Sequence, residues 1–447
     1  MIIKNRDALS ITKLRKQALD IIEAGITRVL PPNIMKSAVI YDMDNRTLTI
    51  NGDLYHLSKG RVFVIGGGKA SGLMAETLEN LITPRNISAG VVNCKGGHYK
   101  AGKTKIIIAG HPVPDERGIS GVNEMLALKQ RYSINEEDLV ICLISGGGSA
   151  LMPYPVDKVS LKDKQSITEL LLSSGAEIGD INAVRKHLSK IKGGRLGYHY
   201  SPATVVSLIL SDVIGDNLSV IASGPTSPDP STFSDAYDVL KRYNLLARAP
   251  KSAVNFLRKG CRGEMPETPK ALNNCHNYII GSNRLALEAM LEKAREMGFN
   301  PYIITAEQKG DTASAARIRA NEILSSRYAG YNAILIGGET TPTLPAAAGR
   351  GGRNQHYAAV SMLAMKPYAG EWAIASVGTD GSDFLPDAAG AIVDNNSLIS
   401  AKDKGIDVKP YIDRYDSNTL LDRIGNSLVI TSDTGTNVSD VILYLLK

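Results

Sequence analysis

Short apolar runs alternate along this chain with segments whose apolar residues recur at helical spacing. Residues 62–65 form one such run, and apolar side chains then follow at three- and four-residue intervals as far as Ile82. A short, wholly apolar run is typical of a strand buried on both faces, and the spacing after it is typical of an amphipathic helix. This alternation predicts an α/β fold with helices on both faces of a parallel sheet.

One interruption divides the pattern into two predicted domains. Proline, glycine and asparagine are frequent between residues 249 and 277, and the alternation restarts after that stretch. We therefore predict a Rossmann-like α/β domain with a parallel sheet over residues 1–262 and a smaller α/β domain over residues 263–447. Strand-like runs in the first domain include 89–94, 105–109, 139–144 and 205–210, and those in the second include 333–336 and 372–377.

Polar, glycine-containing segments follow these predicted strands repeatedly. The chain has 42 glycines, and several lie in short runs directly after a strand-like segment. Ligands of open parallel sheets bind beyond the carboxyl ends of the strands. We therefore expect the segments after these strands to line a ligand site; they begin at residues 66, 145, 211, 337 and 378.

The first glycine segment combines a strand-to-helix turn with a lysine. Backbone N–H groups and the helix dipole favour an anion at such a turn, and Lys69 adds a full positive charge. Neither the Walker A nor the dinucleotide fingerprint fits, because Ala70 follows the lysine and Ser71 takes the place of the third glycine. We predict phosphate or carboxylate binding, with a tight turn and a surface lysine as the alternative. The predicted binding residues are Gly66, Gly67 and Gly68.

Two further segments have a similar character. A second glycine loop lets a ligand approach the backbone closely, although close packing of helix on strand is the alternative. It consists of Ser145, Gly146, Gly147, Gly148 and Ser149.

A basic helix predicted to begin at Arg185 continues to Lys192 and Arg195, which flank two glycines at its end. We predict that this pair of cations also binds anions, whereas a charge run of this kind is otherwise a solvated face.

Two aspartates at strand ends are candidate metal ligands. Asp212 follows the run at 205–210, and Asp380 follows the run at 372–377. Either carboxylate can hold Mg²⁺, and Asp212 can also accept a proton from a substrate hydroxyl. Helix capping or a plain turn is the alternative for each residue.

A glycine-rich loop at residues 349–355 contains two arginines. Arginine forms bidentate hydrogen bonds to carboxylate or phosphate, and neighbouring glycines let a small ligand come close. Both Arg350 and Arg353 are therefore predicted to bind an anionic ligand, and Arg353 also precedes a predicted helix. Glu339 and Asn354 are predicted to bind substrate or nucleotide beside them, and a flexible surface loop is the alternative.

Charge and cysteine content exclude several classes of protein. The chain has 51 Lys plus Arg against 45 Asp plus Glu, a net charge of +6 over 447 residues, which is too mild and dispersed to indicate nucleic-acid binding. No apolar run has the length of a membrane span. The four cysteines are far apart in sequence, which argues against a zinc site or a disulfide framework. We expect a cytoplasmic protein.

Ten motifs in this order resemble those of the class II glycerate 2-kinases, whose C-terminal part is called the MOFRL domain. The resemblance extends over about residues 60 to 447. The motifs are VIGGGKA (64–70), GHPVPD (110–115), SGGGSA (145–150), NAVRKHL (182–188) with IKGGRL (191–196), LSDVIGD (210–216), ASGPT (222–226), GGETT (337–341), GGRNQ (351–355), GTDG (378–381) and TGTNV (434–438).

This resemblance implies ATP-dependent phosphorylation of D-glycerate at its 2-hydroxyl, giving 2-phosphoglycerate and ADP, with Mg²⁺. It also implies two α/β domains with the active site in the cleft between them, and essential catalytic roles for Lys69 and Arg353, with Arg350 as the rival of Arg353. D-glycerate and ATP are the expected partners, and a homodimer is compatible with the resemblance. The chain departs from the family pattern at His356, where an acidic residue is expected, at Ser432-Asp433 and at Phe384-Leu385.

Two other functions are compatible with the sequence. One is an NAD(P)H-dependent hydroxypyruvate reductase, which acts on the same small acids but ordinarily requires the dinucleotide fingerprint that this chain lacks. The other is a non-catalytic, two-lobed sensor of a nucleotide or small anion. In the kinase hypothesis, Lys69 neutralises the charge of the phosphates. Arg353 binds the glycerate carboxylate or stabilises the charge of the transition state. Asp212 or Asp380 then binds Mg²⁺ or orients the hydroxyl.

Overall fold

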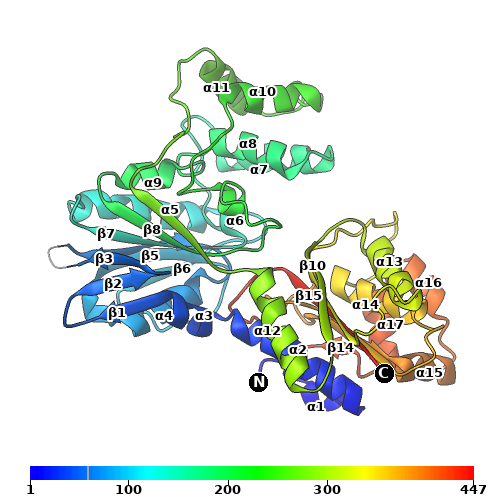
Figure 1. Ribbon diagram of the computed structural model, residues 1–447. Coiled ribbons are helices and arrows are strands. Elements are labelled where there is room, and N and C mark those ends of the chain that lie inside the picture. Colours follow the sequence, from blue (N-terminus) through cyan, green and yellow to red (C-terminus); the bar gives the residue numbers. More distant parts are fainter. Residues whose placement is uncertain (58–59) are drawn as a thin grey trace. The chain divides into compact units, whose positions relative to one another are not determined.

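The computed structural model describes residues 1–57 and 60–447, which form two compact units (Figure 1). The inserted unit comprises Ile34–Ile280, and the terminal unit comprises Met1–Asn33 together with Gly281–Lys447. The predicted boundary at residues 262 and 263 therefore differs from the observed division at 280 and 281. The prediction also assigned the first 33 residues to the N-terminal domain, whereas they belong to the terminal unit.

The inserted unit contains the parallel sheet expected from the sequence. Its strand order is β6-β5-β4-β7-β8-β9, and the pairs β4–β5, β4–β7, β5–β6 and β7–β8 are parallel. The strands are β4 (Val62–Gly67), β5 (Ile87–Cys94), β6 (Thr104–Ile108), β7 (Leu139–Ser145), β8 (Thr204–Leu210) and β9 (Cys275–Gly281). A separate antiparallel sheet consists of β1 (Val39–Asp42), β2 (Thr47–Ile50) and β3 (Asp53–His56).

Helices cover this parallel sheet and also form a helical layer of their own. Helix α3 (Pro31–Ala38) contains the division between the units at residues 33 and 34. The other helices are α4 (Ser71–Ile82), α5 (Glu116–Arg131), α6 (Gly148–Leu151), α7 (Leu161–Ser173), α8 (Ile178–His187), α9 (Arg195–Tyr200), α10 (Phe233–Arg242) and α11 (Lys251–Cys261), with short 3₁₀ turns η1 (Pro84–Asn86) and η2 (Ile221–Ser223). Apolar residues of α5 and α9 share a core with the sheet. Helices α7, α8, α10 and α11 pack around a separate core (Figure 1). The stretch predicted as an interruption thus contains α11 and the start of β9.

The terminal unit has a mixed sheet of order β10-β11-β15-β12-β13-β14. Its strands are β10 (Pro301–Gln308), β11 (Ala333–Gly338), β12 (Trp372–Gly378), β13 (Gly390–Asp394), β14 (Leu428–Val429) and β15 (Asp440–Leu446). Strands β10 and β11 are parallel, whereas β15 runs antiparallel to both β11 and β12. Residues alternate between the two faces, because Leu335 belongs to one apolar core while Ile334 and Ile336 belong to another.

The helices of the terminal unit cover both faces of its sheet. They are α1 (Arg6–Leu9), α2 (Lys13–Arg28), α12 (Asn283–Glu296), α13 (Thr312–Leu324), α14 (Arg353–Ala364), α15 (Asn395–Asp403), α16 (Val408–Asp413) and α17 (Ser417–Ile424). Apolar residues of α2 and α12 pack on one face, and those of α13 to α17 pack on the other.

Helix α2 explains why the first residues belong to the terminal unit. Its apolar side chains, including Leu19 and Ile22, are fully buried in the core shared with α12 and the mixed sheet. The Arg15 side chain is buried beside them and donates from Nη2 to Asp394 Oδ1 over 3.0 Å. The apolar periodicity of α2 reveals an amphipathic helix but does not identify the sheet that covers it.

Candidate functional site

The two glycine loops of the inserted unit pack against each other beyond strands β4 and β7. The backbone N–H of Lys69 donates to the Gly146 carbonyl over 2.8 Å, and that of Ala70 donates to Ser145 Oγ over 2.9 Å. A side chain at Gly68 would overlap Ser145 Oγ, so this position requires glycine. The two loops are far apart in the sequence but are hydrogen-bonded to each other in the folded protein.

Lys69 and His111 meet at the second loop. Gly147 has φ +81°, and a Cβ there would lie 2.9 Å from His111 Nε2 and 3.1 Å from Lys69 Cγ. A side chain at Gly147 would therefore be strained and would crowd both residues. Sequence reasoning did not assign His111 a role, although it lies in one of the ten motifs.

Lys192 also contacts the second loop. Its side chain is 1% exposed, and Nζ donates to the Gly148 carbonyl over 2.8 Å. Burial lowers the pKa of this ammonium well below its ordinary value, and the positive charges of Lys164 and Arg185 lower it further. The structure thus brings Lys192 together with the predicted anion loop.

Arg195 does not lie at the end of one basic helix, as the sequence predicted. Helix α8 ends at His187, and Arg195 is the first residue of the separate helix α9. Gly193 and Gly194, with φ of +59° and +82°, directly precede α9, and Gly194 is its N-cap residue. The Arg195 guanidinium donates to the carbonyl oxygens of Ser189 and Pro266 over 2.5 and 3.2 Å.

The remaining loop residue, Ser149, contacts a strained turn. Its hydroxyl lies 2.8 Å from the hydroxyl of Ser223, which donates to Asn182 Oδ1 over 3.1 Å. Ala222 and Ser223 have φ of +51° and +60°, a conformation that costs free energy for residues other than glycine. Such strain is typical of functional sites, so the turn at 222–223 belongs with the candidate site.

Asp212 lies close to this assembly along the sheet. It is two residues beyond β8, and the final residue of that strand, Leu210, pairs in register with Ser145 of β7. The prediction that Asp212 follows a strand end of the same sheet as Lys69 is therefore confirmed. Its role remains a prediction.

The terminal unit contains a second constellation around Arg353, the first residue of α14. Arg353 donates from Nε and Nη2 to the two carboxylate oxygens of Asp440, over 2.5 and 3.0 Å. Its Nη1 lies 2.9 Å from Glu339 Oε1. Burial opposes the charged guanidinium, but Asp440 and Glu339 outweigh this effect and raise its pKa. The predicted neighbours Arg353 and Glu339 are thus in direct contact.

Asp440 is a member of this constellation that the sequence did not indicate. It begins β15 and pairs in register with Gly338 of β11 on one side and Gly378 of β12 on the other. Because β15 is antiparallel to both neighbours, its first residue lies at the edge where those strands end. The signal in the sequence that could have indicated Asp440 is a carboxylate directly before an apolar run, beside the motif at 434–438.

Asp383 completes this second constellation by capping helix α14. Its carboxylate accepts hydrogen bonds from the backbone N–H groups of Asn354 and Gln355, over 2.9 and 2.8 Å. Complete burial nevertheless raises the pKa of Asp383 to about 6. A Cβ at Gly352 would overlap Asp383, so glycine permits this approach. Asn354 is buried and has a structural contact here, in addition to its predicted binding role.

Arg350 and Asp380 contact other residues. Arg350 is exposed and forms an ion pair with Asp387 at 2.6 Å. Asp380 Oδ1 accepts from the backbone N–H of Ser382 over 3.0 Å.

Across residues 1–57 and 60–447, no group of three or more His, Cys, Asp or Glu side chains is placed to hold a metal ion. The two predicted metal ligands, Asp212 and Asp380, lie in different units.

Magnesium remains compatible with this donor set. Mg²⁺ is usually held by one or two carboxylates together with substrate phosphates and water, so a dedicated protein cage is not required. The strand-end carboxylates of Asp212 and Asp380 have the hard oxygen chemistry that such an ion prefers.

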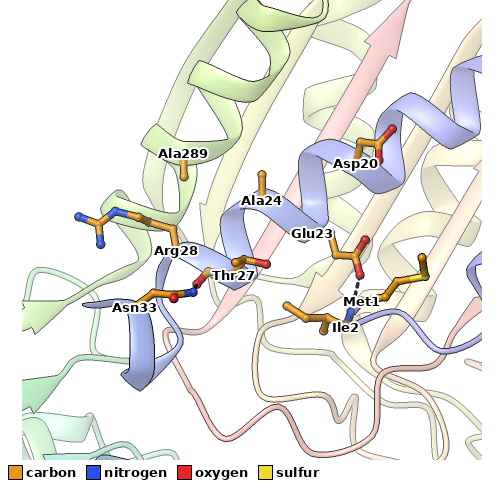
Figure 2. A pocket seen from close by; sticks show the side chains of 9 residues that line it. All are labelled: Met1, Ile2, Asp20, Glu23, Ala24, Thr27, Arg28, Asn33 and Ala289. Atoms are coloured by element: carbon orange, nitrogen blue, oxygen red, sulfur yellow. Dashed lines mark hydrogen bonds between the residues drawn. The ribbon is translucent and has the colours of Figure 1, made fainter. Parts of the chain in front are cut away.

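A pocket on the terminal unit contains none of the predicted site residues (Figure 2). It has a volume of about 560 Å³ and lies beside helix α2. Its two carboxylates, from Asp20 and Glu23, form ion pairs with Arg6, and Glu23 also accepts from the backbone N–H of Ile2. These acidic groups do not favour a phosphate ligand.

Comparisons with known proteins identify the family. Residues 17–258 match a family model described as "Domain of unknown function (DUF4147)", and residues 332–440 match the "MOFRL family". The glycerate 2-kinase of Pyrococcus horikoshii is 38% identical to this chain, and the alignment covers 97% of each protein. The chain belongs to the glycerate 2-kinase family. All four charged residues of the second constellation, Glu339, Arg353, Asp383 and Asp440, lie within the MOFRL match.

A solved structure and a differently named relative extend the comparison. The crystal structure of a glycerate kinase from Thermotoga maritima is 37% identical, has a TM-score of 0.82 and matches 97% of this chain and 99% of its own. An Agrobacterium vitis protein named "Putative hydroxypyruvate reductase" is 40% identical over 92% of each chain. In the described part of the chain, every helix is too short or too polar to cross a membrane.

Proposed function

We propose that this protein transfers the terminal phosphoryl group of ATP to the 2-hydroxyl of D-glycerate, giving 2-phosphoglycerate and ADP. The observation that carries this proposal is the near full-length likeness to the glycerate 2-kinase of P. horikoshii. The lysine-bearing glycine loop and Arg353 support it, because phosphoryl transfer depends on positioning and on neutralising charge.

Each unit contributes distinct chemistry to the proposed reaction. In the inserted unit, Lys69 and the loop at 145–149 would hold phosphate oxygens through an ammonium and backbone N–H groups. In the terminal unit, Arg353 would orient the glycerate carboxylate or stabilise charge on the transferring group. Asp212 would accept the hydroxyl proton or bind metal, and Asp380 is the second metal candidate.

Several finer assignments belong to this proposal. Mg²⁺ would accompany ATP and neutralise charge on its phosphates. A cytoplasmic location, a homodimeric state and the absence of nucleic-acid and membrane partners also remain predictions.

Product analysis tests the proposed reaction. The purified protein would be incubated with ATP, Mg²⁺ and D-glycerate, and phosphorylated products would be resolved by ³¹P NMR. We expect ADP and 2-phosphoglycerate in equal amounts, and none of either when glycerate is omitted. Formation of 3-phosphoglycerate would refute the regiochemistry, and ATP binding without any product would favour the sensor.

A reductase is the second candidate, because the A. vitis relative carries that name. The glycine loop at 66–69 does not match the dinucleotide fingerprint, since Ser71 stands in place of its third glycine. Nicotinamide absorbance distinguishes the two functions directly. A kinase leaves NADH and NADPH unchanged in the presence of hydroxypyruvate, whereas a reductase oxidises one of them without consuming ATP.

A further inference from the structure

Lys164 is a buried lysine without a hydrogen-bonding partner. Its side chain is 7% exposed, and Nζ makes no hydrogen bond within the described residues. On helix α7 it occupies the same face as Ile167 and Leu171, which are buried in the apolar core of the helical layer. Helical spacing predicts an apolar residue at this position, and an unpaired ammonium there is costly.

Three more cationic side chains surround this lysine. Arg185 and Arg195 act on Lys164 electrostatically, and Lys192 is in turn affected by both Lys164 and Arg185. The Arg185 side chain forms no hydrogen bond or ion pair in the part of the chain that the structure describes, and burial lowers its pKa. Lys192 is almost fully buried. These four side chains form the cationic cluster.

Carboxylates compensate only one side of the cluster. Glu267 and Asp229 act favourably on Arg195, but Asp229 is already paired with Lys186 at 3.1 Å. Burial, followed by the charges of Arg185 and Arg195, lowers the pKa of Lys164 to about 7. Bringing like charges together away from water is unfavourable unless an anion neutralises them.

The position of the cluster indicates which anion fits. Lys192 links it to the Gly148 carbonyl, at the start of helix α6 and within the loop predicted to bind anions. A phosphoryl group carries up to two negative charges and several acceptor oxygens, so it matches several lysines and arginines better than a single carboxylate does.

We propose that Lys164, Arg185, Lys192 and Arg195 together form a binding site for a phosphoryl group. The group would come either from the nucleotide or from a phosphorylated small acid. Lys164 and Arg185 are the new members, because the sequence had indicated only Lys192 and Arg195 as ligand-binding residues. The choice of ADP and 2-phosphoglycerate as probes rests on the proposed function. The inference of an anion site rests instead on the positive charges of these four side chains.

Calorimetric titration of the full chain tests the site. The probes are inorganic phosphate, ADP and 2-phosphoglycerate, and the variants are Lys164→Met and Arg185→Gln. We expect each variant to bind at least one probe about 10- to 100-fold more weakly than the wild type does. The control is Lys162→Met, an exposed lysine on the same helix, which should bind all probes as the wild type does. The probe that is weakened identifies the source of the phosphoryl group.

Proton uptake supplies a readout that a purely structural role would not change. An anion bound beside Lys164 favours its charged form, so binding at pH 8 should take up protons in the wild type and less in Lys164→Met. Titrations in buffers of different ionisation enthalpy measure this uptake. Thermal unfolding verifies that each variant is folded.

The outcomes separate this site from the proposed function. Unchanged affinity for all three probes in both folded variants would overturn the site, even if the wild type makes 2-phosphoglycerate. Weakened phosphate binding in the variants would support the site, even if the wild type proves inactive on glycerate.

Discussion

Arg353 is held by carboxylates of its own unit in this structure. A guanidinium fixed by Asp440 on one edge and Glu339 on another has a defined direction, which suits it to a substrate of fixed geometry. Arg350 lacks this support, because its ion pair with Asp387 is exposed at the surface.

These environments predict different outcomes for the two arginines. Arg353→Ala should lower kcat/KM for D-glycerate about 100-fold or more, because it removes a positioned charge. Arg350→Ala should lower it less than about 3-fold. Steady-state assays of both folded variants decide this, and a larger loss at Arg350 would reverse the assignment.

Lys69 permits a matched test in the inserted unit. Lys69→Ala should lower kcat about 100-fold or more, because the glycine loop loses its only formal charge. The control is Lys103→Ala. Lys103 is exposed and directly precedes β6, so it lies at the amino ends of the parallel strands, whereas Lys69 follows the carboxyl end of β4. Near-normal turnover of Lys69→Ala would show that the loop has another purpose.

His356 illustrates how a departure from the family pattern is accommodated. Its ring stacks on Tyr415 with centroids 3.6 Å apart, and Nδ1 lies 2.8 Å from Ser417 Oγ. Burial lowers its pKa to about 4, so the ring is neutral near pH 7. His356 therefore has a packing role in the terminal unit, and its difference from the family pattern does not bear on the reaction.

At the scale of elements, the strand-to-helix turns were predictable, whereas the direction of the C-terminal strand was not. Apolar runs identify β4, β7, β8, β11 and β12 because each is buried on both faces. Apolar runs do not reveal in which direction a strand runs in the sheet. The sequence therefore could not show that Asp440 lies between the ends of β11 and β12. The sequence did not indicate Lys164, because a lysine in a charged helical segment usually lies on a solvated face.

The start of helix α14 depends on a residue without a side chain. Gly352→Ala would place a Cβ against the Asp383 carbonyl and displace the carboxylate that caps the helix. We expect a loss of about 1–3 kcal/mol in the free energy of unfolding. Gly179→Ala, in open space on α8, is the control and should leave stability unchanged or slightly higher. Denaturant unfolding measures both, and equal stabilities would refute the capping role.

Helix α7 contains a group that makes stability depend on pH. The pKa of Lys164 falls from 10.5 in the unfolded chain to about 7 in the folded protein. Between these values the unfolded chain binds more protons, so this group's contribution to stability increases with pH and is lost as pH falls through 7. Relative to Lys164→Met, the wild type should gain about 3 kcal/mol between pH 6.5 and 9.5.

This comparison requires a buffer without phosphate, since a bound anion would retain the charge on Lys164. Urea unfolding of both proteins at each pH gives the difference directly. A constant difference across the range would show that Lys164 titrates normally.

At the scale of the whole molecule, Arg15 ties the first residues to the terminal unit. Arg15→Met would leave Asp394 buried without its ion-pair partner, which costs about 3–5 kcal/mol. The loss should concentrate in the terminal unit. Hydrogen exchange should therefore accelerate in β12 and β15 while β4 and β7 keep their protection. Equal acceleration in both units would contradict the division of the chain.

The nested order of the chain also governs how the protein can be made. During synthesis, helix α2 is translated before the inserted unit, but the sheet that buries its apolar face is complete only after β15 has been translated. The inserted unit is finished long before and can fold while the terminal unit is still incomplete. The nascent chain therefore passes through a stage with one folded globule and an uncovered amphipathic helix, at which chaperones or aggregation compete for the same apolar surface.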